Sequence, residues 1–187
     1  MNFSRLQQTR IPDLAPVYGG ARGRTMSSRH QVYAWRALVE AGVTTIIDLR
    51  EKDHTDRLPA LCEEYGMQYF HYPVDTSAED IAQMVTLFPN LCQHIDAGNF
   101  YIACAMGLHR TDIALCAYWL FYGADQGVEP PQIHGYRQED GHRIDKIMRI
   151  LNAMYDAFME RDGAKPMPQE EFRKRKNVII QQTNLQL

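Results

Sequence analysis

The sequence predicts an α/β fold in which a mostly parallel central sheet is flanked by helices on both faces. Two observations support this prediction. Short runs of β-branched and aromatic residues alternate along the chain with longer stretches of helical character. The helix expected near the middle of the chain is apolar nearly all round, as a helix at the centre of a domain is. Strands that alternate with helices pair in parallel, and a parallel sheet is covered on both faces.

Four strands are expected. Residues 17–20 form a short strand that ends in a turn. Residues 44–49 are a β-branched apolar run, which is typical of a buried strand. Residues 68–72 form the next strand, and residues 99–103 form the strand that leads into Cys104.

Helices are expected between and after these strands, and several have recognisable ends. The first runs from a cap at Ser27-Ser28 to residue 41, where Gly42 ends it. Ser77 opens another with Asp80 at its third position, the spacing of a capping box. The predicted helices cover residues 28–41, 57–65, 77–97, 110–122 and 143–161.

Length and composition predict one enzyme-sized domain. The 187 residues and the 45% hydrophobic content allow a sizeable core, which we place at about residues 17–160, with a C-terminal tail at about 163–187. No apolar stretch is long enough to cross a bilayer, and the first eight residues lack the apolar segment of a secretory signal. We therefore expect a soluble cytoplasmic protein.

The net charge of −3 is close to neutral. Such a chain has no strong field to attract nucleic acid or a membrane surface, so neither is an expected partner. The oligomeric state stays open. A short basic run at residues 173–176 is interpreted as a solvated helix face, with a weak anion or partner contact as the alternative.

The four cysteines predict neither a disulfide framework nor a zinc site, because they are widely spaced and contain no C-x-x-C pair. Cys62, Cys92 and Cys116 are expected to be buried. His134, Asp140 and His142 match no compact ligand pattern, so no metal and no cofactor are expected. They fall in the irregular stretch at residues 123–142, which we interpret as a solvated connector; the alternative is that Tyr136, Arg137 and Gln138 frame a pocket.

The most specific motif is C-x-x-G-x-x-R-T at residues 104–111, placed between a strand and a helix. Its curl from Cys104 to Arg110 is long enough for the backbone amides to surround a tetrahedral oxyanion, closed by the first turn of the helix. Gly107 stands where this curl needs a positive φ angle. The residues expected to bind phosphate are Ala105, Met106, Gly107, Leu108, His109 and Arg110.

The same loop predicts a reactive thiolate at Cys104. Inward amides, the helix dipole and Arg110 all favour the ionised form, so its pKa is expected to fall from ~8.5 into the range of roughly 3.5–7.5. The guanidinium of Arg110 can bind two phosphate oxygens at once. The Thr111 hydroxyl can hydrogen-bond the sulfur when the thiolate leaves. The competing interpretation is a buried structural cysteine with an exposed arginine at a helix start.

This loop resembles the signature loop of the cysteine-dependent protein tyrosine phosphatases, particularly the small dual-specificity type, and the resemblance extends loosely over residues 17–158. It implies a phosphatase-like three-layer sandwich, with Cys104 as nucleophile, Arg110 as phosphate-binding residue and Thr111 as the hydroxyl that assists departure of the thiolate. Two positions depart from the family pattern. Ala103 replaces the usual histidine and Asp112 the usual glycine, and both could weaken activity.

A general acid is expected on the loop that follows residues 68–72. Asp75 precedes Cys104 by the kind of interval seen for the acid of dual-specificity phosphatases, and it lies at the strand edge where ligands bind. As a structural residue it would instead cap the helix at Ser77. Asp53 and Asp80 are weaker candidates, and Asp48 is expected to end its strand structurally.

The resemblance implies a phosphoric monoester hydrolase that forms a cysteinyl phosphate. The loop carries no lysine, which favours a phosphoprotein (tyrosine or dual-specificity) or a small monoester over a highly charged inositol phosphate or phosphoinositide. The His-Arg-Thr ending also resembles atypical members that act on inositol pyrophosphates. The alternatives are a non-catalytic phosphate-binding module and, with less support, a sulfur-transfer or arsenate-reducing enzyme.

Overall fold

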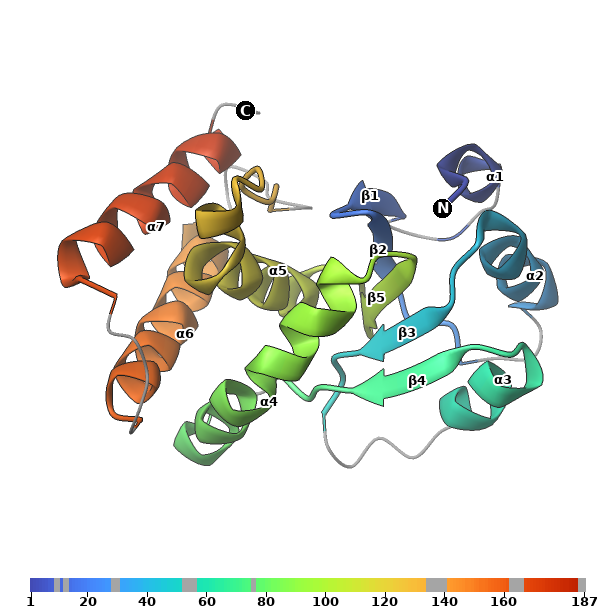
Figure 1. Cartoon of the computed structure of the whole chain (residues 1–187), viewed down its shortest axis with the longest axis horizontal. Helices are drawn as coiled ribbons and strands as arrows, with labels where there is room; N and C mark the ends of the chain where they lie inside the picture. Colours follow the sequence, from blue (N-terminus) through green and yellow to red (C-terminus); the bar gives the residue numbers. More distant parts are fainter. Residues whose placement is uncertain are drawn as a thin grey trace. The chain divides into compact units, whose positions relative to one another are not determined.

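A five-stranded sheet forms the centre of the protein's first compact part (Figure 1). The computed structural model describes residues 1–8, 11, 14–27, 31–51, 57–74, 77–133, 141–161 and 167–184. The strand order is β1-β2-β5-β3-β4. β2 and β5, β5 and β3, and β3 and β4 pair in parallel, whereas β1 and β2 are antiparallel. The predicted α/β fold with a mostly parallel sheet is therefore confirmed.

Three of the predicted strands match the structure closely. They are β3 (Thr45–Asp48), β4 (Gln68–His71) and β5 (Phe100–Cys104). β3 and β5 are buried along their whole length. β5 is apolar, whereas β3 carries Ile46 and Ile47 between the buried polar residues Thr45 and Asp48.

The prediction at residues 17–20 is wrong in detail. β1 ends at Val17 (Ala15–Val17), and Tyr18 and Gly19 form the turn, with φ angles of 47° and 77°. The chain then enters β2 (Gly20–Arg24), a strand that was not predicted. Its five residues include two glycines and two arginines, which have little preference for strands.

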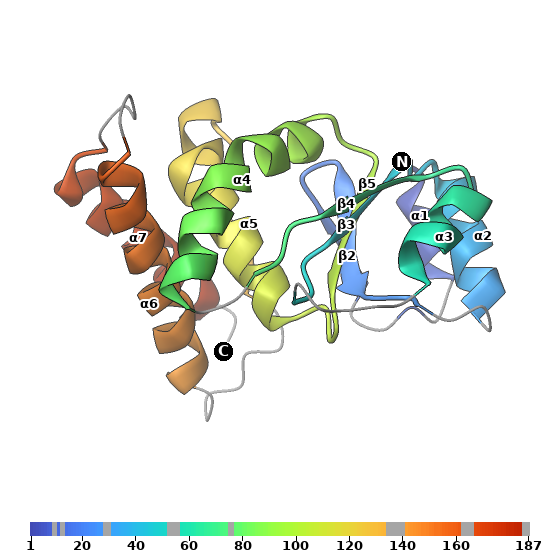
Figure 2. The same ribbon diagram turned by 90° about the horizontal axis from the view of Figure 1, so that it is seen from below.

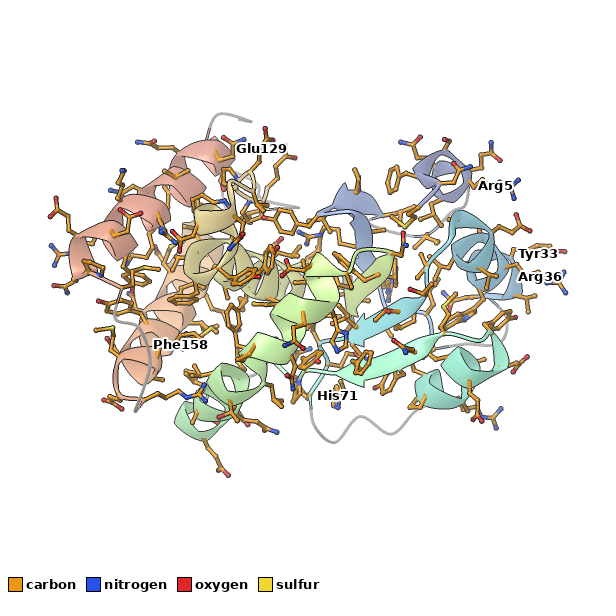
Figure 3. The ribbon with its side chains drawn as sticks, in the orientation of Figure 1. Arg5, Tyr33, Arg36, His71, Glu129 and Phe158 are labelled. Atoms are coloured by element: carbon orange, nitrogen blue, oxygen red, sulfur yellow. The ribbon has the colours of Figure 1, made fainter. Side chains whose placement is uncertain are left out.

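The chain divides into two compact units, Met1–Pro73 with Asn90–Thr111, and Val74–Pro89 with Asp112–Leu187. The first unit contains the whole sheet. On one face of this sheet lie α2 (Val32–Ala41) and α3 (Leu58–Glu64), with α1 (Phe3–Gln7) beside α2 (Figures 1 and 2). Their buried side chains form one apolar cluster with the strands, including Leu6, Trp35, Leu38, Ile46, Leu61 and Tyr101. Tyr33 and Arg36 lie on the outer side of α2, away from the sheet (Figure 3).

The opposite face of the sheet is also covered by a helix. Tyr69 packs against the cluster on the first face, so the next residue, Phe70, points to the other face. There its ring stacks on His94 at a centroid distance of 3.7 Å, and His94 belongs to the end of α4 (Ala78–Asp96). The sheet is therefore flanked by helices on both faces, as predicted.

Most predicted helix ends are confirmed. The Asp80 amide donates to the Ser77 hydroxyl oxygen at 3.1 Å, so the predicted capping box starts α4. Gly42 and Gly66 adopt φ angles of 88° and 70° after α2 and α3. α2 begins at Val32, later than predicted, and Ser28 lies outside the described residues.

The second unit is helical. It contains most of α5 (His109–Phe121), the 3-10 helix η2 (Gly123–Gln126), α6 (Gly141–Met159) and α7 (Gln169–Asn184). Aromatic rings join these helices: Phe121 lies 4.8 Å from Phe158 and 6.1 Å from Phe172 between ring centroids (Figure 3 labels Phe158).

The basic run at residues 173–176 is only partly a solvated helix face, so that interpretation is corrected at Arg175. This residue is buried and donates to the Leu120 carbonyl at 2.9 Å. It also forms ion pairs with Asp125 and, at 2.8 Å, with Glu171. A buried guanidinium needs such partners, and α7 therefore packs through this arginine as well as through Phe172.

Cys62, Cys92 and Cys116 are buried free thiols, as expected. No helix in the described part of the chain is long and apolar enough to span a membrane. Within that same part, no group of three or more His, Cys, Asp or Glu side chains is arranged to hold a metal ion.

Candidate active site

Cys104 is the last residue of β5, at the carboxyl end of the parallel strands. Its carbonyl accepts a hydrogen bond from the Thr25 amide at 3.0 Å, and the neighbouring Ala103 carbonyl accepts one from the Leu49 amide at 2.9 Å. The strands on either side thus fix the position of the cysteine backbone. The chain then curls through residues 105–108 and enters α5 at His109.

Gly107 shapes this loop in two ways. Its φ angle is +71°, the left-handed conformation that the sequence predicted. The loop also lies against β2: a Cβ atom on Gly107 would stand 2.5 Å from the carbonyl carbon of Gly23 and 2.7 Å from the amide nitrogen of Arg24. Any side chain at residue 107 would therefore displace the loop from β2.

Arg22 supports the loop from β2. This side chain is 1% exposed, and its Nη2 atom donates to the Gly107 carbonyl at 2.7 Å and to the Leu108 carbonyl at 3.3 Å. A neighbouring residue of β2, Gly23, leaves room for the Tyr101 ring, whose hydroxyl donates to the Arg24 carbonyl at 2.7 Å. The strand and the loop are thus joined by hydrogen bonds as well as by close packing.

The pKa of the Cys104 thiol lies below its ordinary value. The side chain is 3% exposed, and this burial by itself raises the pKa. Hydrogen bonds to the sulfur outweigh burial: they come from the Thr111 side chain and from the amides of Thr111, Met106 and Gly107. The loop therefore favours the thiolate, which is the reactive form of cysteine.

Thr111 lies in the first turn of α5 and is fully buried. Its hydroxyl makes no other hydrogen bond among the described residues, and its effect on the Cys104 thiol is to lower the pKa. This contact is the one expected of a residue that stabilises the thiolate.

Arg110 forms an ion pair with Glu51, which follows β3. The side chain of Arg110 is 27% exposed and that of Glu51 is 58% exposed, so the pair lies at the surface beside the loop. The loop motif predicted Arg110, whereas Glu51 lies in a different part of the sequence.

A buried polar network lies at the end of β3. The guanidinium of Arg50 binds the carboxylate of Asp48, with Nη2 to Oδ2 at 2.7 Å, and the Tyr69 hydroxyl donates to the same oxygen at 3.0 Å. A ring nitrogen of His71 lies 2.8 Å from the Arg50 carbonyl (Figure 3 labels His71). Asp48 thus holds the chain that leads to Glu51, which agrees with the structural role expected for it.

The remaining loop residues differ in exposure. Ala105 and His109 are exposed, Leu108 is half-buried, and Met106 is 51% exposed. The rim of the loop is therefore apolar except for His109 and the Arg110–Glu51 pair.

Several of the predicted residues lie outside the described part of the chain. Asp75 and Asp53 lie outside the described residues, as do His134, Tyr136, Arg137, Gln138, Asp140 and the side chain of His142. Asp80, a weaker candidate for the acid, is engaged in capping α4 with Ser77. Asp112, which departs from the family pattern, is buried in the first turn of α5.

Sequence reasoning missed Arg22 and Glu51. A signal for Arg22 exists in the pattern Gly20-Ala-Arg-Gly-Arg24, where arginine alternates with small residues directly after a turn. No comparable signal marks Glu51. It contacts Arg110 because the fold brings the end of β3 close to the loop.

A strand, a cysteine loop closed by a buried threonine, and an arginine at the start of an apolar helix define the fold and loop of the cysteine-dependent, dual-specificity-like phosphatases. The sequence profile of the family described as "DSP-PTPase phosphatase fused to NAD+ Kinase" matches residues 7–149. The chain belongs to this family.

Two solved structures agree on the fold. A proposed phosphatase of the DUF442 type from Shewanella putrefaciens CN-32 superposes with a TM-score of 0.56 at 22% identity, covering 81% of this chain and 93% of that one. A second structure of the same description gives a TM-score of 0.55 at 20% identity, covering 82% and 97%. A variant of human DUSP28 is more distant, with a TM-score of 0.43 at 15% identity over 92% of this chain and 99% of that one. No curated protein sequence matches the chain.

Proposed function

We propose that the protein is a phosphoric monoester hydrolase in which Cys104 is the nucleophile. The thiolate attacks phosphorus, an S–P bond forms, and the P–O bond to the leaving group breaks as Asp75 donates a proton to the departing oxygen. Asp75, now a carboxylate, then removes a proton from water. This water attacks the cysteinyl phosphate, inorganic phosphate is released, and the Thr111 hydroxyl stabilises the departing thiolate.

The lowered pKa of Cys104 is the observation that carries this proposal. Hydrogen bonds from one hydroxyl and three main-chain amides favour the anion at a thiol that burial would otherwise keep neutral. A structural cysteine has no need of such donors. Cys92 gives the contrast: burial first and the charge of Asp96 second raise the pKa of its thiol to about 12.

The proposed phosphate site consists of the amides of residues 105–109 and the guanidinium of Arg110. Charge on the phosphoryl oxygens is then neutralised by donors that belong to the chain itself. We therefore expect hydrolysis without added metal.

The proposed substrate is a phosphoprotein, at tyrosine or at both tyrosine and serine or threonine, or a small monoester. The exposed Met106 side chain gives an aromatic leaving group an apolar surface to contact. The loop offers no lysine, and Glu51 places a negative charge beside Arg110, which opposes a ligand with several phosphates. An inositol phosphate or phosphoinositide is thus the less favoured substrate class.

A non-catalytic phosphate-binding module is the second candidate function. Ala103 and the buried Asp112 support it, because both differ from the family pattern next to the loop. Such a module would bind an oxyanion without turnover.

Hydrolysis of p-nitrophenyl phosphate tests the proposal. The wild-type protein should release p-nitrophenol without added metal, vanadate should inhibit it, and Cys104→Ser should abolish turnover. Cys92→Ser, which alters another buried thiol, is the matched control and should retain activity. Full activity in Cys104→Ser would overturn the mechanism, and oxyanion binding without hydrolysis in the wild type would favour the binding module.

The acid is tested separately. Asp75→Asn should lower kcat more than it changes KM, since proton donation acts in the transition state. An unchanged kcat would assign the acid to another residue. Rates for phosphotyrosine, phosphoserine, inositol phosphate and phosphoinositide substrates would then rank the substrate classes.

A further inference from the structure

We propose that Arg22 is a positioning residue that aims the amides of Leu108 and His109 at the bound phosphate. The inference rests on the proposed function and assigns part of that site to β2, a strand outside the signature loop. Arg22 would not touch substrate; it would act through two peptide groups of the loop.

Arg22 buries its charge against main-chain carbonyls of the loop. A guanidinium that is only 1% exposed normally needs a carboxylate or several hydrogen-bond acceptors, because burying it alone is costly. Here one nitrogen donates to two consecutive main-chain carbonyls, those of Gly107 and Leu108, at 2.7 and 3.3 Å. These two carbonyls belong to the turn that closes the proposed cradle.

The contacts of Arg22 also determine the direction in which the Leu108 and His109 amides point. In a trans peptide the C=O and N–H groups point in opposite directions, and the described chain contains no cis peptide bond. The Gly107 carbonyl shares its peptide group with the Leu108 amide, and the Leu108 carbonyl shares one with the His109 amide. Because Arg22 holds both carbonyls, both amides point away from β2.

The loop then divides its donors between two anions. The amides of Met106 and Thr111 hydrogen-bond the Cys104 sulfur, and the Gly107 amide, which donates to the Cys104 carbonyl at 3.2 Å, also lowers the pKa of the thiol. The peptide groups that Arg22 holds lie between Gly107 and Thr111, at the start of α5, where helix amides bind anions readily. Within the proposed phosphate site, the first set therefore also serves the thiolate, and we assign the Leu108 and His109 amides to phosphate oxygens alone.

This division predicts a specific effect of changing Arg22. Arg22→Lys keeps the positive charge but has a shorter side chain, so its ammonium stops short of the place where Nη2 meets both carbonyls. Affinity for tungstate, a phosphate mimic, should fall by about tenfold or more, which is what losing a hydrogen bond to a charged group causes. KM should rise more than kcat falls, and the Cys104 pKa should stay near its wild-type value because the sulfur keeps its own donors.

Arg175→Lys is the matched control. Arg175 is also a buried arginine that donates to a main-chain carbonyl, that of Leu120, and it lies outside the proposed site. Both variants should be less stable than the wild type in urea, and only Arg22→Lys should lose tungstate affinity. Equal tungstate affinity in Arg22→Lys and the wild type would overturn the inference, as would an equal loss in both variants.

A measurement on the wild-type protein keeps the inference testable if Arg22→Lys does not fold. When ¹⁵N-labelled protein is saturated with tungstate, the amide protons of Leu108 and His109 should shift downfield as they form hydrogen bonds to the anion. No shift at either amide in a protein that binds tungstate would overturn the inference and leave the proposed function standing. If the wild type binds no tungstate, the proposed function and the inference both fail.

Discussion

Arg110 and Glu51 form an ion pair across 59 positions of the chain, beside the loop that begins at Cys104. The carboxylate therefore occupies part of the donor fork that the proposed phosphate site needs. The same contact limits the conformations of the arginine side chain. Glu51 is thus placed to set both the orientation and the anion affinity of Arg110.

Glu51→Gln should strengthen oxyanion binding. The ion pair lies at the surface, and such pairs contribute about 0.2–1 kcal/mol, so the Kd for inorganic phosphate should fall by roughly 1.4- to fivefold. Isothermal titration at low salt measures the change, because salt screens exposed charges.

Glu40→Gln is the control for this charge change. Glu40 is also 58% exposed and pairs with an arginine, Arg5, at 3.1 Å (Figure 3 labels Arg5). It should leave phosphate affinity unchanged. Weaker phosphate binding in Glu51→Gln would mean that orienting Arg110 outweighs competition for its donors.

Gly107→Ala should damage the site more than the fold. The new Cβ atom meets the backbone of Gly23 at 2.5 Å, so the loop must move away from β2, and the positive φ angle adds strain of about 1–2 kcal/mol. We expect kcat/KM to fall at least about tenfold. Gly66→Ala shares the strain, with a φ angle of +70°, but its Cβ meets nothing within 4 Å; it should lose stability and keep activity. Normal activity in Gly107→Ala would contradict the proposed loop geometry.

Thr111→Val should raise the pKa of Cys104. The substitution removes a hydroxyl whose hydrogen bond lowers that pKa, in a site where burial already raises it. The pH dependence of iodoacetamide alkylation, followed at the Cys104 peptide, measures the shift. Thr183→Val, which removes a buried hydroxyl bonded to the Ile179 carbonyl, should leave the profile as in the wild type. An unmoved profile in Thr111→Val would show that the hydroxyl does not serve the sulfur.

The stability of the protein should depend on pH through Cys104. Its folded pKa is lower than that of a free thiol, so the folded state binds fewer protons between the two values. The stabilisation is therefore complete above the free-thiol pKa of about 8.5, and it is lost as the pH falls through the folded pKa. Urea unfolding of the wild type and Cys104→Ser across this range should show a difference in unfolding free energy that grows with pH. A constant difference would indicate an ordinary thiol.

The loop and the strand that leads into it could be predicted from sequence, because both depend on local patterns. An apolar run specifies β5, and the spacing of Cys104, Gly107 and Arg110 specifies the curl. The capping box at Ser77 was recognised for the same reason.

What supports the loop could not be predicted, because it depends on contacts between distant residues. β2 has a glycine- and arginine-rich sequence that is poor for a strand, yet Gly23 allows the loop to approach and Arg22 binds its carbonyls. Arg175 was misjudged for a related reason: its neighbours in sequence are charged, and only the fold shows that Leu120 and Asp125 surround it.

The central claim is that Cys104 carries phosphorus during turnover. Rapid-quench mass spectrometry during hydrolysis of p-nitrophenyl phosphate tests it most directly, preferably in Asp75→Asn, where loss of the base slows breakdown of the intermediate. We predict a phosphoryl group on the peptide that contains Cys104, and none in Cys104→Ser. Turnover with an unmodified Cys104, or with the phosphoryl group on another residue such as His109, would contradict the account.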